Sequence, residues 1–220
     1  MNKIQDKKKK LHLIKATRNQ KFLTGFTMIE VTVTISILII VIMAVLGISF
    51  LGQGFYQRGE VRAEILQNGR IISERMAREI RQADEIITQL PQVPDQPGNP
   101  PPREIEFQDG HTPSPYSYLG SEYYYTYYYI TTSTNEVHRK YMVYCFDSCD
   151  VCGEYFRWND TKMEGEVEIN TFPCELEDRI IGEYVQDVNF WGAGLINISL
   201  TLQKDAEQIE LNTKVLGRNL

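Results

Sequence analysis

Residues 31–51 read VTVTISILIIVIMAVLGISFL, a run of 21 residues without a charge. A helix rises ~1.5 Å per residue, so about 20 such residues cross the hydrocarbon core of a bilayer. A cleavable secretory signal would instead carry an apolar stretch of about 7–15 residues before a small-x-small cleavage site. This run is longer, and Phe50, Leu51 and Gln53 at its end make a poor cleavage site. We therefore expect a single membrane-spanning helix.

Charge divides the chain on either side of this run. The first 25 residues carry eight basic side chains and one acid, so, with the whole chain at −6, the other 195 residues carry a net charge of −13. Only Arg58 and Arg62 follow soon after the run. Because basic flanks stay in the cytoplasm, we expect the N-terminus there and the acidic body outside. The acidic body also argues against nucleic acid as a partner.

One carboxylate, Glu30, stands at the cytoplasmic edge of the apolar run. A charged side chain inside hydrocarbon costs roughly 2.5–3.5 kcal/mol even on lenient scales, so an acid here is a candidate functional residue. A plain membrane anchor has no use for it. Residues 25–30 read GFTMIE, which places Glu30 five residues after Gly25.

Residues 25–30, with the basic leader before them and the apolar run after them, resemble the processing site of type IV prepilins and pseudopilins. The resemblance implies that a membrane prepilin peptidase and methyltransferase cleaves between Gly25 and Phe26 and methylates the new amine of Phe26. Residues 1–25 are then a removed leader, and residues 26–51 the transmembrane and filament-core helix. Glu30 becomes the fifth residue, with an implied role in assembly opposite the amine of a neighbouring subunit. Such a buried pair favours one packing register, because losing either partner is costly.

After this run the pattern becomes that of an amphipathic helix, and we expect residues 52–90 to form the second half of a long helical spine. Oppositely charged pairs at i,i+4 spacing indicate solvated outer faces. Six prolines in residues 91–102 then predict a loop over residues 91–103. The apolar stripe consists of Ile65, Ile72, Met76, Ile80, Ala83, Ile87 and Leu90, and the charged pairs are Glu74–Arg78, Arg75–Glu79 and Arg81–Glu85.

Residues 104–220 are predicted to form a β-rich head. Residues 122–131 and 137–146 are aromatic and β-branched, with a turn at Asn135. Apolar and polar residues alternate through residues 196–203 and again after a polar turn at residues 204–207, which predicts a hairpin. Alternation would place Tyr123, Tyr125, Tyr127 and Tyr129 on one strand face and Tyr124, Tyr128 and Ile130 on the other. We expect one of these aromatic faces to pack on the helix and the other to be partly exposed.

The expected fold class is therefore α+β: a long N-terminal helix, with a transmembrane half and an amphipathic half, packed on an antiparallel β-sheet head. Here the resemblance narrows to the J-type minor pseudopilins of type II secretion and the related W-type minor pilins. It is carried by residues 73–83 (SERMAREIRQA), by the segment from Tyr123 to Arg139, and by the hairpin that follows Phe190 and ends in Arg218 and Asn219. It implies a pilin-like fold, a position at the filament tip with I- and K-type minor subunits, and an inner-membrane assembly platform as a further partner.

Four cysteines, Cys145, Cys149, Cys152 and Cys174, leave two interpretations open. An even number in an extracytoplasmic domain favours two disulfides, with three possible connectivities. Four thiolates with a C-x2-C spacing are also a zinc-binding pattern. Either arrangement would fasten a loop to the head. A calcium site near the cysteines is a further alternative, and its candidate ligands are Asp147, Asp150, Glu175, Glu177 and Asp178.

The sequence offers no set of catalytic residues. It has no Walker loop, no G-x-S-x-G and no H-E-x-x-H, and His12, His111 and His138 form no pair at helical spacing. No enzyme activity and no cofactor are expected. One function class is a structural filament subunit, first held in the cytoplasmic membrane and then assembled into a type IV pilus or secretion pseudopilus. The other is a membrane-anchored extracytoplasmic binding or adhesion domain. Cleavage after Gly25 distinguishes them.

Overall fold

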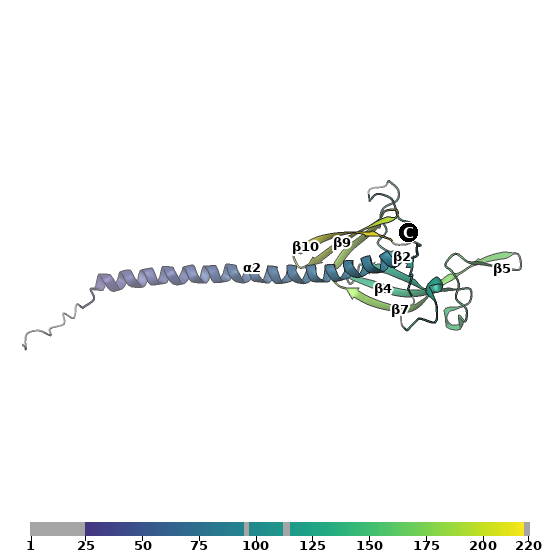
Figure 1. Cartoon of the computed structure of the whole chain (residues 1–220). Helices are drawn as coiled ribbons and strands as arrows, with labels where there is room; N and C mark the ends of the chain where they lie inside the picture. Colours follow the sequence, from purple (N-terminus) through teal and green to yellow (C-terminus); the bar gives the residue numbers. More distant parts are fainter. Residues whose placement is uncertain (1–24, 95–96, 112–114, 218–220) are drawn as a thin grey trace, which may run out of the picture. The chain divides into compact units, whose positions relative to one another are not determined.

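The computed structural model describes residues 25–94, 97–111 and 115–217 (Figure 1). The chain forms two compact units, Met1–Gly54 and Phe55–Leu220. The basic leader before Gly25, His12 within it, and the closing pair Arg218 and Asn219 lie outside the described residues. Helix α2 (Met28–Gln82) has 55 residues and contributes to both units.

The described part of the first unit is the apolar half of α2. Among the described residues α2 is the one helix long and apolar enough to cross a membrane, and no residue of its most apolar 18-residue window is buried. Side chains on every side of this half are exposed, with Ile40, Met43 and Ile48 each at 67% or more. A helix that is apolar all round needs an apolar surrounding. The predicted membrane-spanning segment is thus a helix of suitable length and composition.

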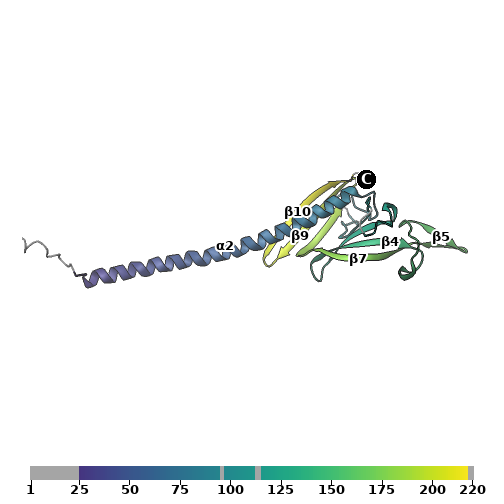
Figure 2. The same cartoon turned by 60° about the horizontal axis from the view of Figure 1, so that its bottom comes forward.

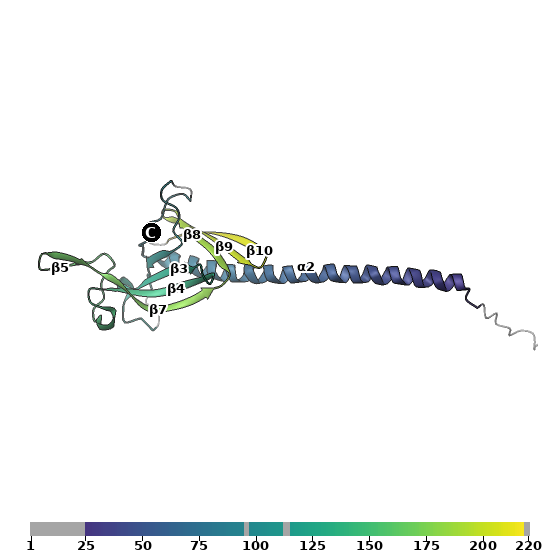
Figure 3. The same ribbon diagram turned by 180° about the vertical axis from the view of Figure 1, so that it is seen from behind.

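In the second unit the C-terminal part of α2 lies between two antiparallel sheets (Figure 1). The five-stranded sheet has the order β1-β2-β3-β4-β7, the three-stranded sheet has the order β10-β9-β8, and β5-β6 form a separate hairpin. Figure 3 shows β3, β4 and β7 side by side. The strands are β1 (Glu85–Ile86), β2 (Ile105–Gln108), β3 (Tyr125–Thr131), β4 (Glu136–Cys145), β5 (Thr161–Glu164), β6 (Val167–Asn170), β7 (Phe172–Gly182), β8 (Val185–Trp191), β9 (Leu195–Lys204) and β10 (Glu207–Leu216), with 3-10 turns η1 (Ser121–Tyr123) and η2 (Cys149–Val151).

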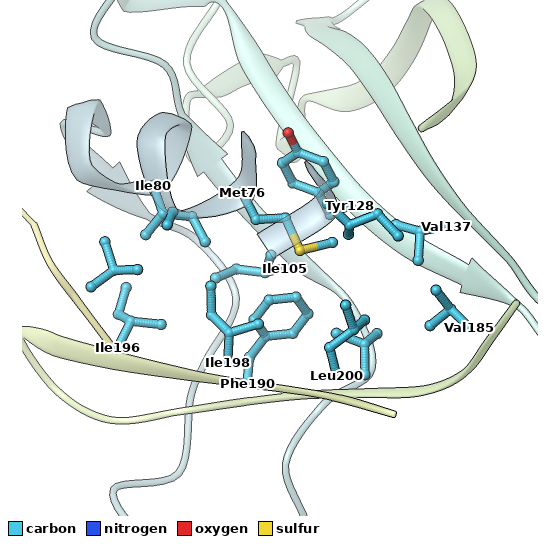
Figure 4. Close-up of a cluster of buried hydrophobic side chains, with 14 of the residues drawn as sticks. Met76, Ile80, Ile105, Tyr128, Val137, Val185, Phe190, Ile196, Ile198 and Leu200 are labelled. Carbon is cyan, nitrogen blue, oxygen red and sulfur yellow. The ribbon is translucent and has the colours of Figure 1, made fainter. Parts of the chain in front are cut away.

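The predicted apolar stripe of the helix forms one wall of the main core. Met76 and Ile80 point between side chains of both sheets, among them Phe190, Ile198 and Tyr128 (Figure 4). Each fully buried side chain of this size contributes roughly 1.5–3 kcal/mol relative to exposure. Gly69 allows the helix to approach the three-stranded sheet, because a Cβ there would clash with Leu211 and Leu202. The α+β arrangement of helix and antiparallel sheets confirms the expected fold class.

The helix ends at Gln82, so the prediction that it continues to residue 90 is wrong. Asp84 N donates to Gln108 O (3.0 Å) and Ile87 N donates to Glu106 O (2.9 Å), and residues 85–86 pair with β2. Backbone pairing with β2 replaces the helical hydrogen bonds over this stretch. Of the three predicted helical ion pairs, Arg75–Glu79 forms at 3.4 Å, whereas Glu85 of the third lies in a strand.

The tyrosines of β3 alternate between the two faces of the sheet, as predicted. In β3 the side of Tyr127 and Tyr129 faces away from the helix, and the side of Tyr128 faces the main core. Tyr123 departs from the prediction because it lies in η1, before the strand begins at Tyr125. Asn135 adopts a positive φ of 57° in the turn to β4, a conformation that asparagine tolerates well.

The proline-rich loop is held at both ends by backbone hydrogen bonds from β8 and from Gly192, which follows it. Gly192 N donates to Pro91 O (2.8 Å), and Phe190 N donates to Pro102 O (3.1 Å). In the described part of residues 91–103 there is no helix or strand. The final hairpin forms as predicted, with Lys204 opposite Glu207 and Ile196 opposite Val215.

Candidate functional site

The predicted processing site lies at the beginning of α2. Gly25 and Phe26 precede the helix and are exposed, with Phe26 at 78%. Thr27 precedes the first helical residue, and its Oγ1 accepts a hydrogen bond from Glu30 N (3.3 Å). Threonine is a favourable residue at a helix N-terminus, because its hydroxyl satisfies a backbone N–H that lacks an intrahelical acceptor. The Gly25–Phe26 bond is therefore accessible immediately before a capped helix.

Glu30 differs from the other polar side chains of the apolar half. The hydroxyls of Thr32, Thr34, Ser36 and Ser49 all donate to backbone carbonyls three or four residues earlier, at 2.8–2.9 Å. Such bonds let a hydroxyl lie within an apolar helix without an outside partner. Within the described residues the Glu30 carboxylate makes no hydrogen bond and no ion pair. It occupies the first turn, where the helix dipole favours negative charge.

A second glutamate of α2, Glu79, has a different environment. Its Oε2 accepts hydrogen bonds from Arg139 Nε (2.7 Å) on β4 and from Tyr128 OH (2.6 Å) on β3. The Glu79 and Arg139 side chains are only 12% and 6% exposed. The Arg139 guanidinium also lies 3.7 Å from the ring centre of Tyr141. These residues, which we call the Glu79 cluster, join the helix to the five-stranded sheet.

The i,i+4 spacing of Arg75 and Glu79 predicts a solvated outer face for Glu79. This prediction is wrong, because the Glu79 side chain is only 12% exposed. Glu79 lies three residues after Met76, which puts it on the flank of the apolar stripe rather than opposite to it. Its partner Arg139 is 60 residues away in the sequence. The signal available from the sequence was a charged residue beside the stripe, but nothing in the pattern identifies the partner.

Asp109 lies close enough to the Glu79 cluster to respond to its charges. Asp109 is 5% exposed, and its backbone N donates to Tyr124 O (3.0 Å). Burial, reinforced by the negative charge of Glu79, raises the pKa of Asp109 to about 6, although the backbone N–H of His111 donates to its Oδ1 at 3.1 Å. Burial likewise raises the pKa of the Tyr124 hydroxyl, which has no hydrogen-bond partner among the described residues.

The opposite face of the five-stranded sheet carries tyrosines bonded to acids. Tyr129 OH donates to Asp178 Oδ2 (2.7 Å), and Tyr144 OH donates to Glu106 Oε1 (2.6 Å). His138 Nδ1 lies 3.0 Å from Asp178 Oδ1, so the aspartate is shared. Burial raises the pKa of Glu106 despite the bond from Tyr144. The tyrosines are thus held in place by carboxylates, which gives this face a fixed set of aromatic rings.

The four cysteines form two disulfides, Cys145–Cys152 and Cys149–Cys174. The disulfide interpretation is confirmed, and no thiolate remains for the zinc alternative. The second bridge fastens the loop after β4 to β7, next to a small core that contains Tyr124 and Val143. For the calcium alternative, the part of the chain that is described contains no group of three or more His, Cys, Asp or Glu side chains arranged to hold a metal ion.

Comparisons with protein-family models, with curated proteins and with solved structures give no significant match.

Proposed function

We propose that this chain is a minor pilin or pseudopilin: a structural subunit that is cleaved after Gly25, methylated on Phe26 and assembled into an extracytoplasmic filament through α2. The observation that carries the proposal is Glu30, a carboxylate without a partner among the described residues in the first turn of an otherwise self-satisfied apolar helix. An anchor needs length and apolarity only. A carboxylate at this place calls for a partner that arrives from outside the chain.

The chemistry of the cleaved terminus supplies such a partner. Cleavage would leave an amine on Phe26 and remove the eight basic residues of the leader. Glu30 would lie about 6 Å from that amine along the helix axis, at ~1.5 Å per residue. In the membrane both groups sit near the cytoplasmic interface, where water solvates them. In a bundle of apolar helices, Glu30 of one subunit pairs with the amine of the next, and the pair sets the register.

The β-rich head fits the extracytoplasmic part of such a subunit. Two disulfides fasten it, and disulfides persist in oxidising compartments outside the cytoplasm. A position at the filament tip beside I- and K-type subunits, with prepilin peptidase and the inner-membrane assembly platform as earlier partners, belongs to this proposal through the sequence resemblance. The competing function is a membrane-anchored binding domain that never leaves the bilayer.

Substitution of Glu30 tests the assembly role. Glu30→Ala should leave the protein inserted and cleaved after Gly25 but reduce its recovery in sheared filament fractions by at least about tenfold, because the amine of a neighbour then lacks its partner. Glu60→Ala, which removes an exposed carboxylate from the same helix, is the matched control and should assemble normally. Normal incorporation of the Glu30→Ala protein would contradict the proposal.

A further inference from the structure

A groove of about 420 Å³ runs along the second unit between α2 and β10. The helix contributes Arg70, Arg78 and Arg81 to it, together with Ser73, and the strand contributes residues 211–213. We call it the arginine groove. No residue of β9 lines it, so it opens on the side of β10 that faces away from β9.

The strand side of the arginine groove is an unpaired sheet edge. β10 has ten residues and pairs with β9 alone among the described strands. An edge of this length presents backbone N–H and C=O groups to any extended segment that lies beside it, and proteins usually protect such edges. The groove therefore leaves the backbone of β10 available for a further strand.

The helix side of the groove carries three arginines against one acid. Arg70, Arg78 and Arg81 are exposed, and none of them forms an ion pair with a described residue. They extend along about 16 Å of helix, at ~1.5 Å per residue. Glu74 is the acid among the lining residues. The rest of the body is acidic, with a net charge of −13 after residue 25, so a basic stripe fits a segment rich in carboxylates.

A buried hydroxyl adds a second sign of a missing partner. Ser73 lines the groove with a side chain only 7% exposed, and its Oγ is buried without a hydrogen-bond partner among the described residues. Leaving such a group unsatisfied is costly. A segment bound in the groove would lie beside this unsatisfied hydroxyl.

The same chain carries a segment that matches the groove. The β5–β6 hairpin is exposed along nearly its whole length, including Met163 and Val167 at 63% and 64%. Glu164, Glu166 and Glu168 lie within or beside its turn, and none of them forms an ion pair with a described residue. A two-stranded hairpin alone is marginally stable. Figure 2 shows β5 projecting from the head away from β9 and β10, so a hairpin meets the groove of another molecule more readily than its own.

We propose that the arginine groove binds the β5–β6 hairpin of a second copy of this chain, with β6 added to the free edge of β10 and the hairpin carboxylates facing the arginines. Groove and hairpin are different surfaces, so the contact is heterologous. Such a contact closes into a reciprocal pair or a ring when the rotation between copies permits it, and otherwise extends into an open row. It goes beyond the proposed function and does not depend on cleavage or on Glu30.

Charge reversal on the full chain in detergent tests the contact. The groove variant R78E/R81E and the hairpin variant E166R/E168R should each self-associate at least about tenfold more weakly than the wild type in sedimentation velocity, because like charges then meet. An equimolar mixture of the two should associate again, and so should the chain that carries all four changes. R58E/R62E, on exposed helix residues outside the groove, is the control and should behave as the wild type.

Two results would overturn the proposal. One is that the wild-type chain does not self-associate, or that both charge-reversal variants self-associate as strongly as the wild type. This would follow if a different subunit occupied the groove. The other is loss of association in each variant without recovery in the mixture. Unchanged thermal unfolding of each variant verifies folding, as expected because the altered side chains are exposed. Absence of cleavage after Gly25 would refute the proposed function without affecting this contact. Failure of one proposal can therefore be distinguished from failure of the other.

Discussion

The two glutamates Glu30 and Glu79 belong to the same helix, yet their surroundings differ completely. Glu79 is 12% exposed and accepts bonds from Tyr128 and Arg139, which the head itself provides. Glu30 lies in an exposed apolar segment and has no partner among the described residues. A buried carboxylate needs its partner for the fold to be stable. A carboxylate such as that of Glu30, which has no partner among the described residues, indicates a partner that binds after folding.

The largest expected effect separates the two glutamates by stability. Glu79→Ala leaves Arg139 buried without its carboxylate and should reduce the free energy of unfolding of the head by about 3–5 kcal/mol. Glu30→Ala should change it by less than about 0.5 kcal/mol. Denaturant unfolding of the full chain in detergent, followed by near-UV circular dichroism, measures both. A loss below about 1 kcal/mol for Glu79→Ala would show that the Glu79 cluster does not hold helix to sheet.

Removal of a disulfide should affect the head and leave the apolar half of α2 unchanged. The bridge Cys149–Cys174 spans 25 residues, so replacing both cysteines by serine should cost about 3.5 kcal/mol of head stability in the chain-entropy model. Replacing the pair Cys145–Cys152, seven residues apart, should cost about 2.5 kcal/mol. The same unfolding assay ranks the two double variants. A reversed order would contradict the loop-length argument.

Asp109, beside the Glu79 cluster, should make the stability of the head depend on pH. The folded state raises its pKa from 3.8 to about 6, so folding favours the protonated form, and the free energy of unfolding should fall as the pH rises from about 4 to about 6. Asp109→Asn keeps an Oδ1 acceptor for His111 N without the charge. It should stabilise the head by about 2–3 kcal/mol at pH 8 and by almost nothing at pH 3.5. Equal effects at both pH values would contradict this account.

The smallest predicted effect concerns Tyr128. Tyr128→Phe removes one of the two hydrogen bonds to Glu79 Oε2 and keeps that from Arg139, so we expect a loss of about 1–2 kcal/mol. Tyr129→Phe removes a hydroxyl that bonds Asp178 on the exposed face, and serves as the matched control with a smaller loss. If the two variants lost the same free energy of unfolding, the Glu79 cluster would contribute no more to stability than an exposed hydrogen-bonded pair.

Periodicity was sufficient for the parts of the fold in which one face is buried. The apolar stripe from Ile65 to Ile80, the alternation in the final hairpin and the turn at Asn135 all form as predicted. The end of the helix was not predictable in this way. Ile87 and Leu90 continue a helical spacing, but pairing with β2 supplies the backbone hydrogen bonds instead, and no local pattern reveals a partner strand 20 residues ahead.

Long-range pairing limits what the sequence reveals about sites. The four cysteines indicated disulfides, but the choice among three connectivities depends on how β7 returns beside β4. The Glu79 cluster joins residues 49 and 60 positions apart. The arginine groove is likewise not predictable from the sequence, because Arg78 and Arg81 fit i,i+4 ion pairs on an isolated helix. Only the fold shows β10 beside them.

N-terminal peptide mass spectrometry on the protein recovered from its native membrane shows directly whether the chain is cleaved after Gly25. We expect a mature chain that begins at Phe26 and carries one methyl group on its amine. A chain that begins at Met1 or Asn2, in cells with an active prepilin peptidase, would contradict the proposed function and leave an anchored binding domain as the function.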